Sequence, residues 1–152
     1  MDTCVVETTR LAVGPMAAEA ERIGIELAPT IANLLTPRTT VALPDAWRGD
    51  YTLERASSWV TEREADSTCL LITDRSERPV GLLILAEVPL TETTVDVRIG
   101  YLIAEGAWGN GYASELLQGA IEWAATQAGL TSLTGGVDAS NRASIRVLEK
   151  NG

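Results

Sequence analysis

Apolar residues recur along the chain with two spacings, one of three to four residues and one of two. The longer spacing predicts helices over 16–27, 52–64 and 113–128, and a short helical piece over 31–35. Pro29 is expected to end the first helix, because proline disfavours a helical conformation in the residue before it. A long irregular stretch, 36–51, is expected to form a lid or substrate loop. In that loop, Trp47 either lines a substrate pocket or pins the loop to the core.

Strands are predicted where apolar residues alternate or form short compact runs, over 7–13, 68–73, 80–88, 94–104 and 131–137. The alternation is clearest over 94–104, where every second residue is apolar and shares one face: Val95, Val97, Ile99, Tyr101 and Ile103. Turns at 74–79 and 89–93 join the middle strands into antiparallel hairpins. Asp138 to Asn141 is expected to cap a last helix that turns Ala143, Val147 and Leu148 inward. The order predicts one mixed α/β domain over 1–152.

The segment Trp108-Gly109-Asn110-Gly111-Tyr112-Ala113-Ser114 joins a strand to the best-defined helix, which Gly129 is expected to cap. Two glycines allow a tight turn and leave no side chains over its amides. The start of the helix has N–H groups without intrahelical partners at the positive end of its dipole. This combination predicts a phosphate or pyrophosphate site, although a plain strand-to-helix connection would also need the glycines.

Composition removes several classes of function. The chain has no histidine, which excludes Ser-His-Asp and Cys-His catalysis and argues against a zinc site. Its formal charge of −9 disfavours nucleic acid as a partner and mildly favours a cationic substrate. No apolar run is long enough to cross a membrane, and Cys4 and Cys69 have no metal-like spacing. We therefore expect a cytoplasmic protein with reduced thiols and no metal.

Spacing also excludes two nucleotide-binding motifs. Ser114 stands where the third glycine or alanine of a dinucleotide-binding G-x-G-x-x-G turn belongs. Asp138 is too far along the chain for the ribose contact of that motif. No Gly-Lys-Ser/Thr follows the turn, which excludes the phosphate loop of nucleotide hydrolases.

Three segments in this order resemble the GNAT acetyltransferases, and more narrowly the RimJ/RimL-like branch. They are Ile99-Gly100-Tyr101-Leu102-Ile103, then Trp108-Gly109-Asn110-Gly111-Tyr112-Ala113, then Asn141-x-x-Ser144 with Glu149-Lys150-Asn151-Gly152. Thr9-Arg10-Leu11 and the region from Leu43-Pro44 to Trp59 are similar to that branch as well. The resemblance spans nearly the whole chain and implies a mostly antiparallel sheet, flanked by helices, that splays open at the acyl-CoA site.

The resemblance implies that acetyl-CoA lies in the splay, beside a bulge in the strand before the glycine turn. Backbone groups around Leu102 and Ile103 would pair with the pantetheine, and a bulge amide near Leu102 would polarise the thioester carbonyl. The pyrophosphate would lie on amides of the turn, contributed by Trp108, Gly109, Asn110, Gly111, Tyr112, Ala113 and Ser114. Asn141 would reach the pantetheine from the last helix.

The chain departs from the family pattern at its catalytic positions. Leu148 stands where a thiolate-protonating tyrosine is common, so Ser144 is the candidate proton donor. A serine on a helix can equally bond a backbone carbonyl one turn back. Arg98 replaces a frequent glutamate; an ion pair between Asp96 and Arg98 is expected, and Glu87 is another candidate base acting through water.

The function implied is transfer of an acetyl group from acetyl-CoA directly to a primary amine, either a small amine or a protein or peptide N-terminus. The alternative is an acyl-CoA-binding module or sensor with weak or no activity. The resemblance also implies two further strands after Gly152, which this sequence lacks. We therefore expect either a longer natural chain or a second copy, as in a homodimer, that covers the edge of the strand over 131–137.

Overall fold

The structure is a computed structural model that describes residues 5–41, 45–135 and 143–146. Its centre is a seven-stranded sheet in which the strands neighbour one another in chain order. The strands are β1 Val6–Glu7, β2 Leu11–Pro15, β3 Thr68–Asp74, β4 Pro79–Pro89, β5 Val95–Ile103, β6 Leu130–Gly135 and β7 Ala143–Arg146. All neighbours are antiparallel except β5 and β6, which are parallel. This confirms the predicted mixed, mostly antiparallel sheet.

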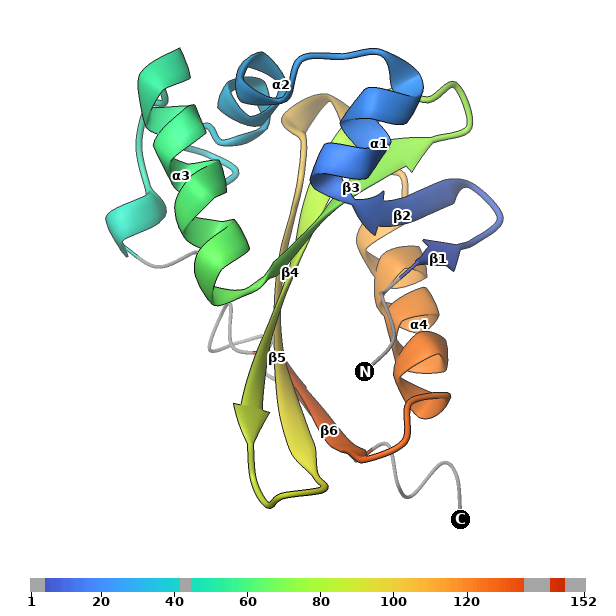
Figure 1. Ribbon diagram of the computed structural model, residues 1–152. Coiled ribbons are helices and arrows are strands. Elements are labelled where there is room, and N and C mark those ends of the chain that lie inside the picture. Colours follow the sequence, from blue (N-terminus) through green and yellow to red (C-terminus); the bar gives the residue numbers. More distant parts are fainter. Residues whose placement is uncertain (1–4, 42–44, 136–142, 147–152) are drawn as a thin grey trace.

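Helices cover both faces of the sheet (Figure 1). On one face, α4 (Tyr112–Ala125) packs against alternate residues of β4 and β5, including Leu83, Val97 and Ile99. On the other, α1 (Met16–Ile23), α2 (Leu27–Leu34) and α3 (Leu53–Asp66) pack over Leu71, Leu82 and Leu102. Two 3-10 turns, η1 (Asp45–Trp47) and η2 (Glu105–Ala107), lie in the connections. The predicted alternation of β5 is confirmed, because its odd-numbered residues face α4 and Leu102 faces the other helices.

The N-terminal predictions were wrong in two places. The strand expected over 7–13 is the hairpin of β1 and β2, in which the amide of Thr8 donates to the carbonyl of Leu11. The first helix ends at Gly24, which has a φ of 75°, and not at Pro29. Pro29 lies in the first turn of α2, where a missing N–H costs no hydrogen bond because those amides have no intrahelical acceptor.

Gly129 does not cap α4, which ends three residues earlier than expected, at Ala125. Gly129 has a φ of +82°, and a Cβ placed there would lie 2.5 Å from the carbonyl oxygen of Thr93. Its own carbonyl accepts from the amide of Val95 at 2.8 Å. The glycine is therefore required by a close approach between the start of β6 and the start of β5.

The helix predicted around Ala143 is also wrong within the described residues, where 143–146 form β7. Ser144 of β7 lies opposite Thr134 of β6 in an antiparallel ladder. This pairing satisfies backbone groups that an exposed β6 edge would leave without partners. The chain itself therefore covers the β6 edge, for which we expected either a longer natural chain or a second copy. No helix in the described part of the chain is long and apolar enough to cross a membrane.

Candidate functional site

The pairing of strands β5 and β6 ends at Ile99. Their parallel pairing runs from Val95 opposite Leu130 to Ile99 opposite Gly135, with a register shift between Val95 and Asp96. Beyond that point, β5 continues to Ile103 paired with β4, and no described strand pairs with its other side. We call this side of Gly100–Ile103 the open edge of β5. In Figure 1, β6 accordingly flanks only the lower part of β5.

The hydrogen-bond pattern shows which residues present their backbone to the open edge. The amide of Ala104 donates to the carbonyl of Val80 at 2.7 Å, and the β4–β5 register is unbroken from Gly81 to Pro89. Bonds to one partner fall on every second residue of an antiparallel strand. The backbone of Leu102 therefore faces β4, whereas the N–H and C=O groups of Tyr101 and Ile103 face the open edge. The only register shift on β5 lies at Val95/Asp96, away from the expected position near Leu102.

The glycine turn follows directly from the open edge. Gly109 and Gly111 have φ values of +83° and +76°, and a Cβ on Gly109 would meet no atom within 4 Å. Gly111 is the N-cap of α4, and no side chain caps this helix. The amide of Glu115 makes the first intrahelical bond, to the carbonyl of Gly111 at 3.1 Å. The amides of Tyr112, Ala113 and Ser114 precede that bond, so they are free to bind an anion.

Trp108 connects the turn to the open edge. Its indole Nε1 donates to the carbonyl of Ile103 at 2.6 Å, and its side chain stays 45% exposed. The guanidinium of Arg38 lies 5.3 Å from the ring centre of Trp108 and forms an ion pair with Glu105 at 3.3 Å. Thr36 also donates to Glu105. The start of the predicted lid loop is therefore attached to the glycine turn.

A second arginine flanks the turn from the N-terminal hairpin. Arg10 lies over the ring of Tyr112 at 4.8 Å, and its Nη2 is 3.5 Å from where a Cβ of Gly111 would stand. Its Nε donates to Glu115 at 2.7 Å, and its amide donates to the same carboxylate at 2.7 Å. The hydroxyl of Thr8 also donates to Glu115. The Thr8 hydroxyl, together with Arg10, lowers the pKa of Glu115 from 4.5 to about 2.

The remaining predicted residues lie in different places. The side-chain amide of Asn110 donates to the carbonyl of Ala107 at 2.9 Å and so stabilises the turn itself. Ser114 is exposed on the first turn of α4. Asn141 lies outside the described residues, and of Ser144 only the backbone position on β7 is described.

The expected ion pair between Asp96 and Arg98 is absent from the described part of the chain. The Asp96 carboxylate accepts instead from the hydroxyl of Ser132 and, at 3.1 Å, from that of Thr134. Arg98 is exposed and lies opposite Ala86 of β4 and Thr134 of β6. Glu87 lies opposite Val97, on the face of the sheet that α4 covers and not on the face of Asp96 and Arg98.

Trp47 pins its loop to the core, which was one of the two roles considered for it. Its ring meets that of Trp59 edge to face, with centroids 5.8 Å apart, and the buried guanidinium of Arg63 lies over it at 4.5 Å. The hydroxyl of Tyr51 donates to the carbonyl of Trp47.

Burial raises the pKa of the Cys69 thiol to about 12. That thiol is protonated at neutral pH and is not a nucleophile.

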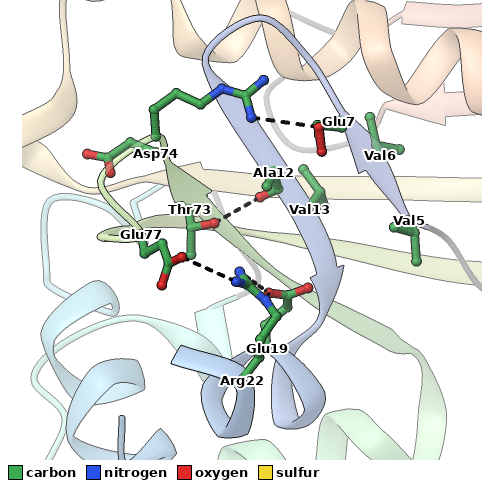
Figure 2. Close-up of a pocket in the computed structure, with 11 residues that line it drawn as sticks. Val5, Val6, Glu7, Ala12, Val13, Glu19, Arg22, Thr73, Asp74 and Glu77 are labelled. Atoms are coloured by element: carbon green, nitrogen blue, oxygen red, sulfur yellow. Dashed lines mark hydrogen bonds and ion pairs between the residues drawn. The ribbon is translucent and has the colours of Figure 1, made fainter. Parts of the chain in front are cut away.

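A cavity of about 280 Å³ lies elsewhere, between β1, β2, the β3–β4 turn and α1 (Figure 2). Carboxylates dominate its polar lining, but arginines pair with them. Arg22 contacts Glu19 at 2.6 Å and Glu77 at 3.5 Å, and Arg75 contacts Glu7 at 3.7 Å. No group of side chains in the described residues could hold a metal ion. The cavity therefore has no evident link to the chemistry of the glycine turn.

Comparison with known proteins identifies the class. The family model described as "Acetyltransferase (GNAT) domain" matches residues 21–152. The chain therefore belongs to the GNAT acetyltransferase family, a family of acyl-CoA-dependent acetyltransferases. The uncharacterised Bacillus subtilis protein YkkB is 36% identical over 61 residues, which cover 40% of this chain and 36% of that protein.

Solved structures share the fold at low sequence identity. A GNAT-family acetyltransferase from Bacillus anthracis superposes with a TM-score of 0.66 at 13% identity, over 87% of this chain and 72% of the other. A ribosomal L7/L12 α-N-protein acetyltransferase, RimL, in complex with coenzyme A gives 0.64 at 17% identity, over 87% and 73%. At these identities the likeness shows a shared fold.

The sequence reasoning missed three residues at this site. Tyr101 presents its backbone to the open edge, and Arg10 and Arg38, each paired with a carboxylate, flank the glycine turn from distant segments. For Tyr101, the short 89–94 turn could have indicated the hydrogen-bond register of the following strand. The resemblance of Thr9-Arg10-Leu11 to the family included Arg10 without giving it a role, and no local pattern marks Arg38. Only the tertiary fold brings the two arginines near Tyr112 and Trp108.

Proposed function

We propose that this protein transfers an acetyl group from acetyl-CoA directly to a primary amine. The observation that carries the proposal is the continuity of three features. The open edge of β5 leads into the glycine turn, and the turn leads into the uncapped start of α4. An extended pantetheine arm could pair with the open edge of β5, and a pyrophosphate could bind the free amides at the start of α4.

The cofactor contacts follow from the geometry of these backbone groups. We assign the pantetheine hydrogen bonds to the backbone of Tyr101 and the amide of Ile103, in place of the expected Leu102, because Tyr101 and Ile103 face the open edge and the Ile103 carbonyl already accepts from Trp108. The amides from Gly109 to Ser114 would hold the pyrophosphate. The net charge of −9 opposes phosphate binding, and Arg10 and Arg38 on either side of the turn are each paired with a carboxylate, so the backbone amides would supply most of the attraction. Asn141 stays a proposed contact by resemblance alone.

The reaction is a single substitution at the thioester. The neutral amine nitrogen forms a bond to the acetyl carbon, the carbon–sulfur bond breaks, and one amine proton ends on the CoA thiol. We assign polarisation of the thioester carbonyl to the amide of Tyr101, which is the open-edge amide nearest the point where β5 and β6 diverge. Ser144, whose backbone lies opposite Thr134, stays the candidate donor to the thiolate. We assign no general base.

The test compares two glycines with the same backbone strain. Gly109 and Gly24 both have a positive φ and open space where a Cβ would lie, but only Gly109 belongs to the turn. Gly109→Ala and Gly24→Ala should each cost about 1–2 kcal/mol of stability. Only Gly109→Ala should weaken binding of acetyl-CoA, because its methyl group would project into the open space of the turn where the pyrophosphate is proposed to bind. Binding is read from the rise in melting temperature at saturating acetyl-CoA. The absence of any rise in the wild-type protein would refute the proposal.

The second candidate is an acyl-CoA-binding module without efficient turnover. Arg98, in place of a frequent glutamate, favours it, as does the engagement of Asp96 by two hydroxyls. Release of the CoA thiol in the presence of a panel of amines distinguishes the two candidates. Thermal stabilisation by acetyl-CoA without thiol release would favour the binding module.

A further inference from the structure

Arg98 lies at the end of the open edge where β6 begins to pair with β5. The last β5–β6 pair joins Ile99 and Gly135, so the two strands diverge one residue after Arg98. The glycine turn lies beyond the other end of β5, after Ile103. A pantetheine arm that runs from the turn along the open edge therefore carries its thioester toward Ile99 and Gly100, next to Arg98. This placement rests on the proposed function.

The side chain of Arg98 is on the face of the sheet opposite α4. Even-numbered residues of β5 share this face, as the packing of Leu102 against α2 and α3 shows. The helices α2 and α3 cover this face around Leu102 but leave Arg98 exposed, so an amine acceptor can approach the thioester beside Arg98. Arg98 is exposed here and available to an acceptor.

Among the described residues, no carboxylate forms an ion pair with Arg98. Its neighbours across the sheet are Ala86 and Thr134, and the nearby Asp96 carboxylate is occupied by the hydroxyls of Ser132 and Thr134. Every other arginine whose side chain the structure describes contacts a carboxylate or backbone carbonyls; Arg55, for example, donates to three carbonyls. A guanidinium stays charged at any physiological pH and matches a carboxylate with two parallel hydrogen bonds.

We infer that Arg98 binds a carboxylate of the acceptor, so that the substrate is an amine of the amino-acid class. The net acidity of the chain favours a cationic amine at long range, but Arg98 is nearer to the proposed thioester position than Asp96 is and presents a cation there. An arginine that holds the carboxylate fixes where the amine of the same molecule lies, which contributes to orienting it for attack. Arg98 is thus a specificity-determining residue and takes no proton in the reaction.

The experiment measures acetyl transfer to a panel of L-amino acids and to the carboxamide of each. The carboxamide lacks the anion. Its amine is also less basic, so a larger fraction of it is neutral at working pH, and this effect by itself favours the carboxamide as nucleophile. The wild-type protein is nevertheless expected to prefer the amino acid by about tenfold or more in kcat/KM. Arg98→Gln should remove this preference mainly through KM, and Arg98→Lys should restore part of it.

Two controls separate the inference from folding and from the proposed function. Arg78→Gln alters another exposed arginine, in the turn before β4, and should leave the preference unchanged. Stabilisation by acetyl-CoA should be the same in Arg98→Gln and wild type, which shows that the variant folds. Equal turnover of acids and carboxamides would overturn the role of Arg98 and leave the acetyltransferase intact. If no amine is acetylated and acetyl-CoA does not stabilise the protein, both the role of Arg98 and the proposed function are overturned.

Discussion

The indole nitrogen of Trp108 donates a hydrogen bond to the carbonyl of Ile103. This bond joins the glycine turn to the last residue of β5 and so fixes the position of the turn relative to the open edge. The tryptophan at this position is therefore a structural anchor of the turn as well as its first residue.

Trp108→Phe tests this anchor. Phenylalanine keeps an aromatic ring for Arg38 but cannot donate to Ile103. Loss of this hydrogen bond should destabilise the conformation of the turn by about 0.5–1.5 kcal/mol. Acetyl-CoA should therefore bind about two- to tenfold more weakly. Isothermal titration of the wild type and the variant measures the change. Unchanged affinity would show that the turn keeps its position without the indole.

Acid should weaken the attachment of the N-terminal hairpin to α4. The pKa of Glu115 is about 2 in the folded protein and near 4.5 when the chain is unfolded, so its ionised form stabilises the fold above about pH 4.5. This contribution is lost as the pH falls from about 4.5 through about 2. Melting temperatures of wild type and Glu115→Gln across this range should therefore converge in acid. Parallel curves would contradict the assignment.

Cys69 should resist alkylation in the native protein. Its side chain is buried and its pKa is about 12, so the thiolate is scarce below the ordinary pKa of 9.0. Treatment with iodoacetamide near neutral pH, followed by peptide mass spectrometry, should leave Cys69 unmodified. The same treatment in denaturant should label it. Rapid labelling of the native protein would mean that the core around β3 opens readily.

Gly129→Ala should destabilise the protein by about 2–4 kcal/mol, because strain at a positive φ adds to a clash with the Thr93 carbonyl. Gly24→Ala has comparable strain without a clash and should cost about 1–2 kcal/mol. Urea denaturation of both variants isolates the clash as the difference between them. Equal losses would mean that the 93–95 segment moves aside freely.

The strands were predictable because burial on alternate faces leaves a period of two in the sequence, as in β5. The start of α4 was predictable from its two glycines. Pro29 and Gly129 misled the prediction, since each residue type has two structural uses that local sequence does not separate. At the site, side-chain alternation placed Leu102 and Ile103 on opposite faces of β5. It did not show that the backbone of Tyr101, and not of Leu102, faces the open edge.

The Glu115 carboxylate, shared between Thr8 and Arg10, has a consequence for how binding is transmitted. Glu115 is on the first turn of α4, directly after the amides proposed to hold a pyrophosphate. Any ligand that rigidifies this turn also restricts the separation of α4 from the β1–β2 hairpin. Amide protons of that hairpin should then exchange with solvent more slowly when acetyl-CoA is bound. The N-terminal hairpin would then report on a cofactor bound at the start of α4.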